Sequence, residues 1–498
     1  MSGFRLLDLV KFFLPILPEI ESPLERVSFD ERIVFTVASG IIFLLSQLPI
    51  YGLVPNAFLK INDPFYFNRS IFAMEKGTLL ELGLLPVVTA SLAWQLAAGL
   101  RLVKVNFNLR SERELFQTGQ KLTAFALAVA YAVGLILTGY YDNVIQGFNP
   151  AEDKFPPVGA VALILLQIVG TSVFITLMVE IFDKGFGFGS GFLSFIALQV
   201  ATNLIRDVAS FESYPIAGTD KFETFGSLAN ALKSLKSFSL NTNFFESFTR
   251  TNLPNLNQLI VSILSVLVVI GLQNMRIELP IRSTKVRGMA NVYPIRLLYT
   301  GALPIVFAYA VLSNIHIFGF ILANLLNTYT SATIISSLIG KWAVNVQSQN
   351  LELTSGALYF LTPATSLFGT LLSPIRSIVY SATIVGLSCW FANIWSGISG
   401  SSPRDIAKQF KEQGITISSK RDISITKELS RVIPVASVSG AFVLAATSIA
   451  GDLLGGLGKG VGAVVGISAA FGILEDFMIE FQQNGGASQF GNAIGGQF

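Results

Sequence analysis

Residues Val158 to Ile181 read VGAVALILLQIVGTSVFITLMVEI, a run in which Glu180 is the only charged residue. A helix needs about 20 mainly apolar residues to cross a bilayer, so this run predicts a membrane span. Nine other stretches support the same prediction, and 189–206 and 434–450 are the shortest of them. We expect ten spans in all, at 33–54, 77–100, 122–140, 158–181, 189–206, 256–274, 295–324, 375–396, 434–450 and 458–481.

The composition of the 498-residue chain is that of a membrane protein and argues against several classes of active site. Hydrophobic residues make up 52% and charged residues 13%, about half the charged fraction of a soluble protein. Cys389 is the single cysteine and His316 the single histidine. An intrachain disulfide, a Cys/His metal cluster and a histidine-based triad are therefore not expected. We predict no enzymatic activity, no cofactor and no metal, and we expect no cleavable signal peptide.

Lysine and arginine set the expected orientation. With the N-terminus in the cytosol and ten alternating spans, the cytosolic segments hold 4, 5, 1, 5 and 7 basic residues, which is 22 of the 34. This bias predicts that both termini lie in the cytosol. Residues 4–17 space Phe4, Leu7, Val10 and Leu14 as on one face of a helix. They predict a short helix on the membrane surface, and the alternative is a disordered tail.

The order of spans and loops divides the chain into five parts. We expect a cytosolic N-terminal segment at 1–32, a first half with five spans at 33–206, and a lumenal loop at 207–255. A second half with five spans follows at 256–481, with basic cytosolic loops at 275–296 and 397–433. A Gly- and Gln-rich cytosolic tail, 482–498, is expected to be disordered at its end. Five spans on each side of one long loop permit an inverted internal repeat.

Ion-coupled transporters carry ionisable residues inside their spans, and here Glu81 is the one acid that we place clearly within a span. A proton or sodium relay is therefore poorly supported. The run 185–191, GFGFGSG, lacks the spacing of a phosphate loop and predicts a tight turn between two spans. Asn68 begins a glycosylation sequon among apolar residues, where we expect no modification. For His316 we expect a packed or pore-facing side chain.

The first basic loop has a physical interpretation of its own. Arg282, Lys285 and Arg287 put three cations on a short, turn-rich excursion. Such a loop suits the phosphate backbone of RNA, which lysine and arginine bind with salt-sensitive affinity. For 397–433 taken alone, a role in topology only is an equally good interpretation.

Five stretches, in this order, resemble the SecY family, which forms the alpha subunit of the Sec protein translocon. They are 77–86 (GTLLELGLLP), 183–191 (DKGFGFGSG), 278–288 (ELPIRSTKVRG), 399–414 (SGSSPRDIAKQFKEQG) and 451–455 (GDLLG). The resemblance covers nearly the whole chain and is strongest to the branch of the eukaryotic endoplasmic reticulum. Within that branch, 1–5, 103–107, 291–294 and 482–486 are most similar to the second of two yeast paralogues.

The resemblance implies an all-α polytopic fold, with ten transmembrane helices in two pseudo-symmetric five-helix halves that form a clamshell around a central pore. A plug would lie at about 62–74, with Arg69 at the family's plug arginine. The family's ring of apolar pore residues would be Leu84, Val88, Phe192, Ile196, Val306 and Val465. A narrow apolar ring blocks ions by dewetting, and Phe192 is bulkier than the usual aliphatic residue.

The same resemblance implies a lateral gate and a ribosome-binding surface. The gate would open between the second and third spans on one side and the seventh and eighth on the other, at Gln95, Asn314 and Tyr131. Ribosome binding would fall to Arg282, Lys285, Arg287 and Arg421. The family often has an acid near the cytosolic end of the eighth span, and here Trp395-Ser-Gly-Ile398 has none. The family's signal-orienting effect of that acid is therefore not expected.

We therefore expect a multi-pass channel subunit of the endoplasmic reticulum membrane, which conducts mainly co-translationally exported chains and releases apolar helices into lipid. Its expected partners are small beta and gamma subunits, the large-subunit RNA and proteins of the ribosome, signal-bearing nascent chains and membrane lipid. Two alternatives remain. A small-molecule secondary transporter would need a charged midplane site, and a ribosome-docking receptor without conduction would not need an apolar ring.

Overall fold

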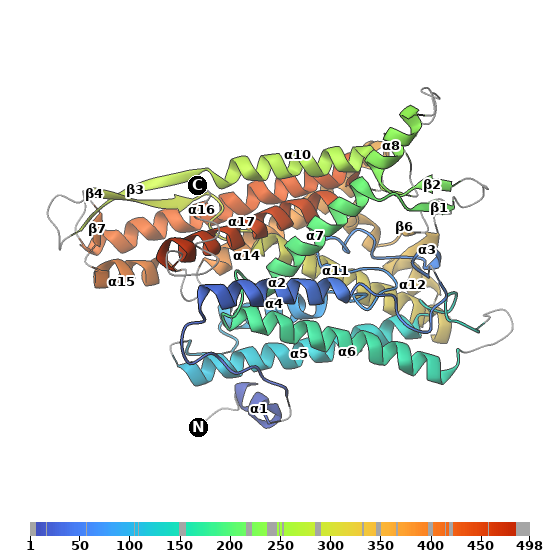
Figure 1. Ribbon diagram of the computed structural model, residues 1–498, viewed down its shortest axis with the longest axis horizontal. Coiled ribbons are helices and arrows are strands. Elements are labelled where there is room, and N and C mark those ends of the chain that lie inside the picture. Colours follow the sequence, from blue (N-terminus) through green and yellow to red (C-terminus); the bar gives the residue numbers. More distant parts are fainter. Residues whose placement is uncertain are drawn as a thin grey trace.

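A computed structural model gives the architecture, which is dominated by long helices that run roughly along the longest axis of the molecule (Figure 1). The structure describes residues 6–15, 17–55, 57–103, 105–107, 109–148, 156–215, 222–236, 247–248, 250, 253–283, 290–330, 333–344, 350–364, 367–396, 402–413, 415–417, 422–456 and 458–484. The tail predicted to be disordered lies outside these residues from 485 onward.

Ten helices correspond to the ten expected spans. Eight of them are long and apolar enough to cross a membrane in the described part of the chain, and α2 and α4 are shorter. The ten are α2 (Phe29–Leu45), α4 (Leu85–Gly99), α5 (Arg110–Leu137), α6 (Val158–Asp183), α7 (Gly191–Ala209), α10 (Leu256–Gln273), α11 (Leu303–Leu325), α14 (Pro374–Trp395), α16 (Asp422–Gly451) and α17 (Lys459–Asn484).

Several predicted span boundaries were wrong, each for a local reason. The first span ends at Leu45 rather than 54, before the helix-breaking Pro49. The second begins at Leu85 rather than 77, because Pro86 fits only the first turn of a helix. α5 begins 12 residues before the predicted 122, and α16 begins at Asp422 rather than 434. In both, charged residues continue the helix beyond its apolar part.

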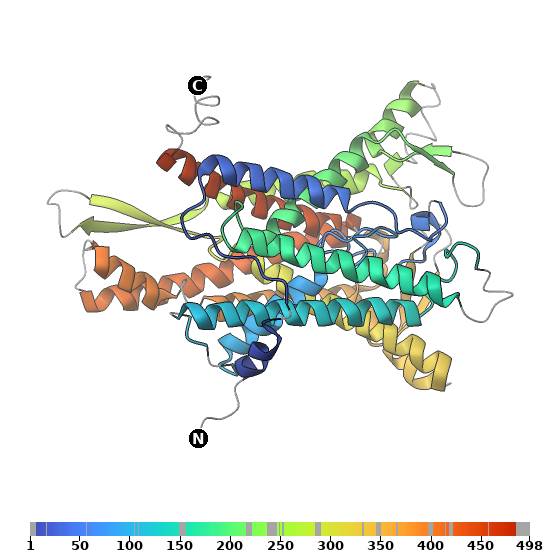
Figure 2. The same ribbon diagram turned by 60° about the horizontal axis from the view of Figure 1, so that its bottom comes forward.

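The spans of each half pack on one another, and the halves meet at two places. α4 packs on α5, α5 on α6 and α6 on α7, while α10 and α16 pack on α17 and α14 packs on α11 and α16. α7 and α17 join the halves along one side, and α4 and α5 contact α11 along the other. Figure 2 shows the same bundle from a second direction. The turn 184–190 joins α6 to α7, as predicted.

Small sheets and short helices extend from both ends of the bundle. The fold is helical as expected, but it also contains short strands that the sequence analysis did not predict. At one end, β3 (Arg276–Ser283) pairs with β4 (Ala290–Arg296) and β7 (Ile415–Ile417), beside α15 (Pro403–Gln413). This end lies at the left of Figure 1. The other end carries two hairpins and the remaining short helices: β1 (Ser213–Pro215) with β2 (Phe222–Thr224), β5 (Lys341–Val344) with β6 (Leu351–Ser355), α3 (Ala57–Lys60), α8 (Ser227–Lys236), α12 (Thr333–Ile339) and α13 (Leu367–Leu372).

The predicted N-terminal helix is present as α1 (Leu6–Phe13), which argues against a disordered tail. Leu7 and Val10 are buried, and Val10 packs against Trp94 of α4 and Phe116 of α5. Phe12, on another face, is 74% exposed. An amphipathic helix that docks on two spans with an apolar side chain still uncovered fits a position at a membrane surface.

Candidate functional site

The six expected ring residues come from four spans, and all are buried. They belong to one continuous cluster of buried apolar side chains at the centre of the bundle. Phe192 is 6% exposed, and Leu84, Val88, Ile196, Val306 and Val465 are 0% exposed. The same cluster contains apolar side chains of the expected plug, among them Phe65, Ile71 and Phe72. The structure therefore brings the ring candidates and the plug into one dry region.

The expected plug is seated against the start of two spans. The backbone N–H of Leu84 donates to the carbonyl of Phe72 across 2.8 Å. A side-chain carbon at Gly458 would overlap the Phe67 carbonyl, and one at Gly462 would overlap the Ser70 hydroxyl. Only glycine permits so close an approach at these two positions. The beginning of α17 thus forms a tight seat for the plug backbone.

Arg69 lies at the centre of a buried polar cluster on the plug. Its guanidinium donates to both carboxylate oxygens of Asp63, to Glu81 Oε1 at 2.7 Å and to the Tyr140 hydroxyl at 2.9 Å. Burial by itself would raise the pKa of Asp63, but the Arg69 charge and its hydrogen bonds outweigh it and leave that pKa below its usual value. Glu81, predicted inside a span, lies in the turn before α4. The cluster ties the plug to the ends of α4 and α5.

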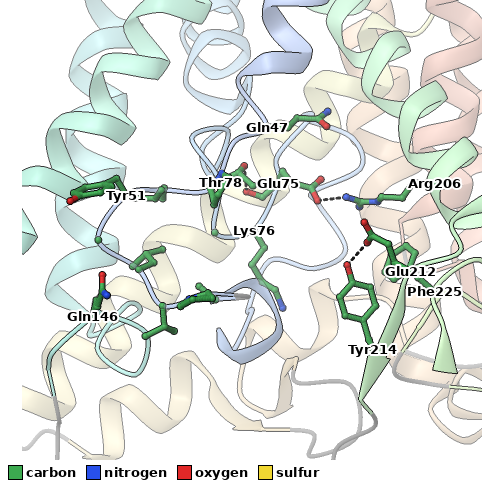
Figure 3. A pocket seen from close by; sticks show the side chains of 18 residues that line it. Gln47, Tyr51, Glu75, Lys76, Thr78, Gln146, Arg206, Glu212, Tyr214 and Phe225 are labelled. Atoms are coloured by element: carbon green, nitrogen blue, oxygen red, sulfur yellow. Dashed lines mark hydrogen bonds and ion pairs between the residues drawn. The ribbon is translucent and has the colours of Figure 1, made fainter. Parts of the chain in front are cut away.

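A second polar contact holds the end of the plug segment to α7. Glu75 accepts from Arg206 at 2.7 Å and from the amide of Gln199 at 3.3 Å, and Gln199 in turn accepts from Gln47 at 2.7 Å. Figure 3 shows the Glu75–Arg206 pair beside a cavity of about 620 Å³, which Lys76 also lines. The plug is therefore fixed at both its middle and its end.

Two of the three expected gate residues meet directly. The Tyr131 hydroxyl of α5 donates to Asn314 Oδ1 of α11, and the Tyr131 ring also contacts Phe318. Asn314 Nδ2 donates to Thr89 Oγ1 of α4 at 2.9 Å and to the carbonyl of Ala310 at 2.6 Å. Neutral hydrogen bonds thus join α4 and α5, two of the five spans of the first half, to α11.

Gln95 does not join this contact. It lines a separate cavity of about 400 Å³ with Trp395, Lys121 and Glu180. Its buried Oε1 accepts no hydrogen bond from the residues that the structure describes. Lys121 pairs with Glu180 at 2.6 Å. Thr89, which the sequence analysis did not name, makes the contact with Asn314 that Gln95 does not make.

The two basic loops form one unit. β3 belongs to the first loop and β7 to the second, with Ile281 opposite Ile417 and Arg282 opposite Thr416. Apolar side chains of β4, α15 and α16 pack beneath this sheet in a cluster of their own. Of the expected ribosome-binding residues, Arg282 lies on β3, while Lys285, Arg287 and Arg421 lie outside the described residues.

Other expectations about single residues also have outcomes. Asn68 is 1% exposed, which leaves no room for a glycan, and His316 is packed between the Phe67 ring and the Leu361 carbonyl. The sequence analysis missed Asp452, an acid at the end of α16 that is 1% exposed. Asp452 belongs to the stretch 451–455 that carries the family resemblance, but that stretch indicated no partner for it, because its partners lie on other helices.

Comparisons with known proteins agree with this arrangement. Residues 78–474 match the SecY family model, and residues 41–77 match the plug domain of Sec61p. The chain is 42% identical to the Sec sixty-one protein homolog of Saccharomyces cerevisiae, over 99% of each chain. It is 38% identical to the SEC61 subunit alpha of Candida albicans, over 95% of this chain and 96% of that one. Identity to yeast SEC61 is 36%, so the predicted similarity to the second yeast paralogue is confirmed.

Solved structures give the same result. The idle yeast Ssh1 complex bound to the 80S ribosome has a chain with a TM-score of 0.76 and 42% identity, over 98% of each chain. The structure described as that of a protein conducting channel shares the fold, with a TM-score of 0.74 and 23% identity over 96% of this chain and 97% of that one. This chain therefore belongs to the SecY family, with the ten-span fold and the plug domain of Sec61.

Proposed function

We propose that this chain is the pore-forming subunit of a translocon in the endoplasmic reticulum membrane. It conducts unfolded chains, mainly during their synthesis, and releases apolar helices sideways into lipid. The observation that carries this proposal is a lateral contact between the two halves that is held by neutral hydrogen bonds at Asn314, beside a buried apolar centre. An anchor or a docking receptor needs neither feature.

The geometry suits opening by an apolar signal helix. A hydrogen bond between membrane helices contributes about 1 kcal/mol, so the bonds that Asn314 makes to Tyr131 and Thr89 oppose opening only weakly. A signal helix gains about 25 cal/mol for each Å² of apolar surface that it moves out of water. A few buried leucines therefore outweigh the gate. The six ring residues would seal the idle pore by dewetting, and Arg69 would hold the plug in it.

We further propose that the β4–β3–β7 sheet and its connecting loops dock the ribosome, through Arg282, Lys285, Arg287 and Arg421. Two solved structures of similar chains support ribosome binding: the yeast Ssh1 complex bound to the 80S ribosome, and Sec61 in the canine ribosome-channel complex. The sheet would then face the cytosol, with both termini on that side. The domain boundaries 1–32, 33–206, 207–255, 256–481 and 482–498, and binding of small beta and gamma subunits, belong to the same proposal.

Site-specific photocrosslinking tests the channel function. A photoreactive residue replaces Val88, and the chain is reconstituted with its small subunits and with ribosomes stalled on a signal-bearing nascent chain. We expect a crosslink to the nascent chain that disappears when the signal is deleted. A probe at Val268, which is 46% exposed on α10, is the matched control and should not crosslink to the nascent chain. Bound ribosomes without a Val88 crosslink would contradict conduction and leave a docking receptor.

A further inference from the structure

Asp452 directly follows α16, and its carboxylate contacts α11, α14 and the residue before α17. Its Oδ2 accepts from the Tyr309 hydroxyl of α11 at 3.0 Å and from the Tyr380 hydroxyl of α14 at 2.6 Å. Its Oδ1 accepts from the backbone N–H of Gly458 at 3.1 Å, where the corner between α16 and α17 turns. Asp452 is 1% exposed, and both tyrosines are 0% exposed.

This carboxylate is stabilised by hydroxyl and amide donors rather than by a cation. Among the described residues, no lysine or arginine forms an ion pair with Asp452. Three donors meet its two oxygens, and a buried carboxylate depends on such donors because leaving it unsatisfied is costly. Movement of α11 or α14 away from the corner would break one or both tyrosine bonds. The position of the corner is therefore linked to the position of two gate spans.

The same corner is the seat of the plug. Gly458, which Asp452 holds, lies directly against the carbonyl of Phe67, and Gly462 lies one helical turn further along against Ser70. The Phe67 ring also packs edge-on against His316 of α11, with ring centroids 5.1 Å apart. The plug thus lies between a gate span and a corner whose spacing is set through Asp452.

We propose that Asp452 is a positioning residue that couples the lateral gate to the plug. When a signal helix displaces α11 and α14, the Tyr309 and Tyr380 hydroxyls pull on the carboxylate, the corner shifts with them, and Gly458 and Gly462 no longer fit the plug backbone. Release of the plug then follows gate opening instead of requiring a separate event. This inference rests on the proposed channel function.

Two variants test the two sets of contacts separately, the one between Asp452 and the gate spans and the one between Asp452 and Gly458. Tyr309→Phe with Tyr380→Phe removes the contacts with the gate spans and leaves the Asp452–Gly458 contact in place. Asp452→Asn keeps the size of the side chain but removes its charge and one acceptor, so it weakens the seat itself. Ser313→Ala on α11 and Ser388→Ala on α14 are matched controls, because each removes a 0% exposed hydroxyl from a gate span.

A photoreactive residue in place of Tyr66, a large plug side chain that lines one cavity with Lys459 of α17, reports the seated plug by crosslinking to α17 within the same chain. In the wild-type complex we expect this crosslink in the idle state and its loss once a signal-bearing nascent chain crosslinks to a probe at Val88. The double tyrosine variant should keep the Tyr66 crosslink after the signal has entered. Asp452→Asn should lower it about tenfold already in the idle state, as expected for loss of a hydrogen bond to a charged group.

The result that overturns the inference is a double tyrosine variant that releases the plug on signal entry as the wild type does, or an Asp452→Asn variant with a normal idle crosslink. A purely structural role would lower the amount of assembled complex and leave the crosslink per complex unchanged, which also overturns the coupling. If the double variant does not assemble, Tyr380→Phe alone should retain an intermediate share of the crosslink. Failure of the wild type to crosslink a signal at Val88 would contradict the channel function itself.

Discussion

Replacing Asn314 by aspartate tests whether its hydrogen bonds hold the gate closed. The two side chains have the same shape, but a carboxylate cannot donate to Thr89 or to the Ala310 carbonyl, whose oxygen lies 2.6 Å from the present amide nitrogen. Asn314→Asp therefore removes the donor of the hydrogen bond to Thr89 and sets two oxygen atoms against each other at Ala310, and the Thr89 hydroxyl can restore a bond only by turning to donate. In the open gate the new carboxylate can reach water, so the substitution favours opening.

The size of the effect follows from two terms. Losing one hydrogen bond between membrane helices removes about 1 kcal/mol from the closed state. A carboxylate in the middle of a span adds a penalty of up to about 3 kcal/mol. Together these terms favour opening by about 1 to 4 kcal/mol. A leucine-to-alanine change in a signal core removes about three methylene equivalents, or about 2.4 kcal/mol. The variant should therefore accept signals that have lost about one leucine.

The assay is translocation of one reporter whose signal core loses one, two or three leucines, measured in microsomes that carry the variant. We expect the wild type to reject a signal that the Asn314→Asp channel still accepts. Asn324→Asp is the control, because it adds the same charge to α11 and, in the described structure, the Asn324 side chain makes no hydrogen bond to α4 or α5. An unchanged leucine requirement at normal complex levels would refute the assignment of Asn314 as the latch.

Three further outcomes are expected. Gly462→Ala should unseat the plug and raise ion leakage of the idle channel several-fold, whereas Gly472→Ala on the same helix, with open space around it, should not; equal leakage in both variants would contradict the tight seat. Arg69→Gln should lower the free energy of unfolding by about 3 kcal/mol or more, because it leaves the buried carboxylates of Asp63 and Glu81 without their cation. An unchanged melting temperature of the purified complex would argue against a stabilising role of these ion pairs. Asp207 and Lys459 form an ion pair at 2.7 Å, and either single charge reversal, Asp207→Lys or Lys459→Asp, should lower the melting temperature. The double reversal should recover most of that loss, and no recovery would show that the pair does not join α7 to α17.

The sequence predicts the spans well because each depends on its own composition. An apolar run such as 158–181 must be buried in lipid or protein wherever it lies, and α6 occupies Val158–Asp183. Span boundaries are less predictable, because hydropathy does not register the charged turns that extend α5 and α16. The β4–β3–β7 sheet was missed because it pairs two segments from loops on either side of α11 and α14.

Single candidate residues of the gate came from the family resemblance alone, and their roles stay predictions. Tyr131 and Asn314 were identified in this way and do meet in the structure. Thr89 and Asp452 were missed, because a threonine inside an apolar helix or an acid at its end has no local pattern that indicates its partner. Their contacts join positions 225 and 143 residues apart in the chain. Such pairings are decided by tertiary packing.

The β4–β3–β7 sheet has a thermodynamic consequence. Its strands β3 and β4 lie between α10 and α11, and β7 precedes α16, so all three belong to the second half of the chain. If the gate opens by movement between the halves, a partner that touches only this sheet makes the same contacts in the closed and the open state. A ligand with equal affinity for two states shifts no population between them, however tightly it binds. Binding of a partner to the sheet and opening of the gate are then independent of each other. A bound partner can favour the open gate only if it also contacts the first half of the chain.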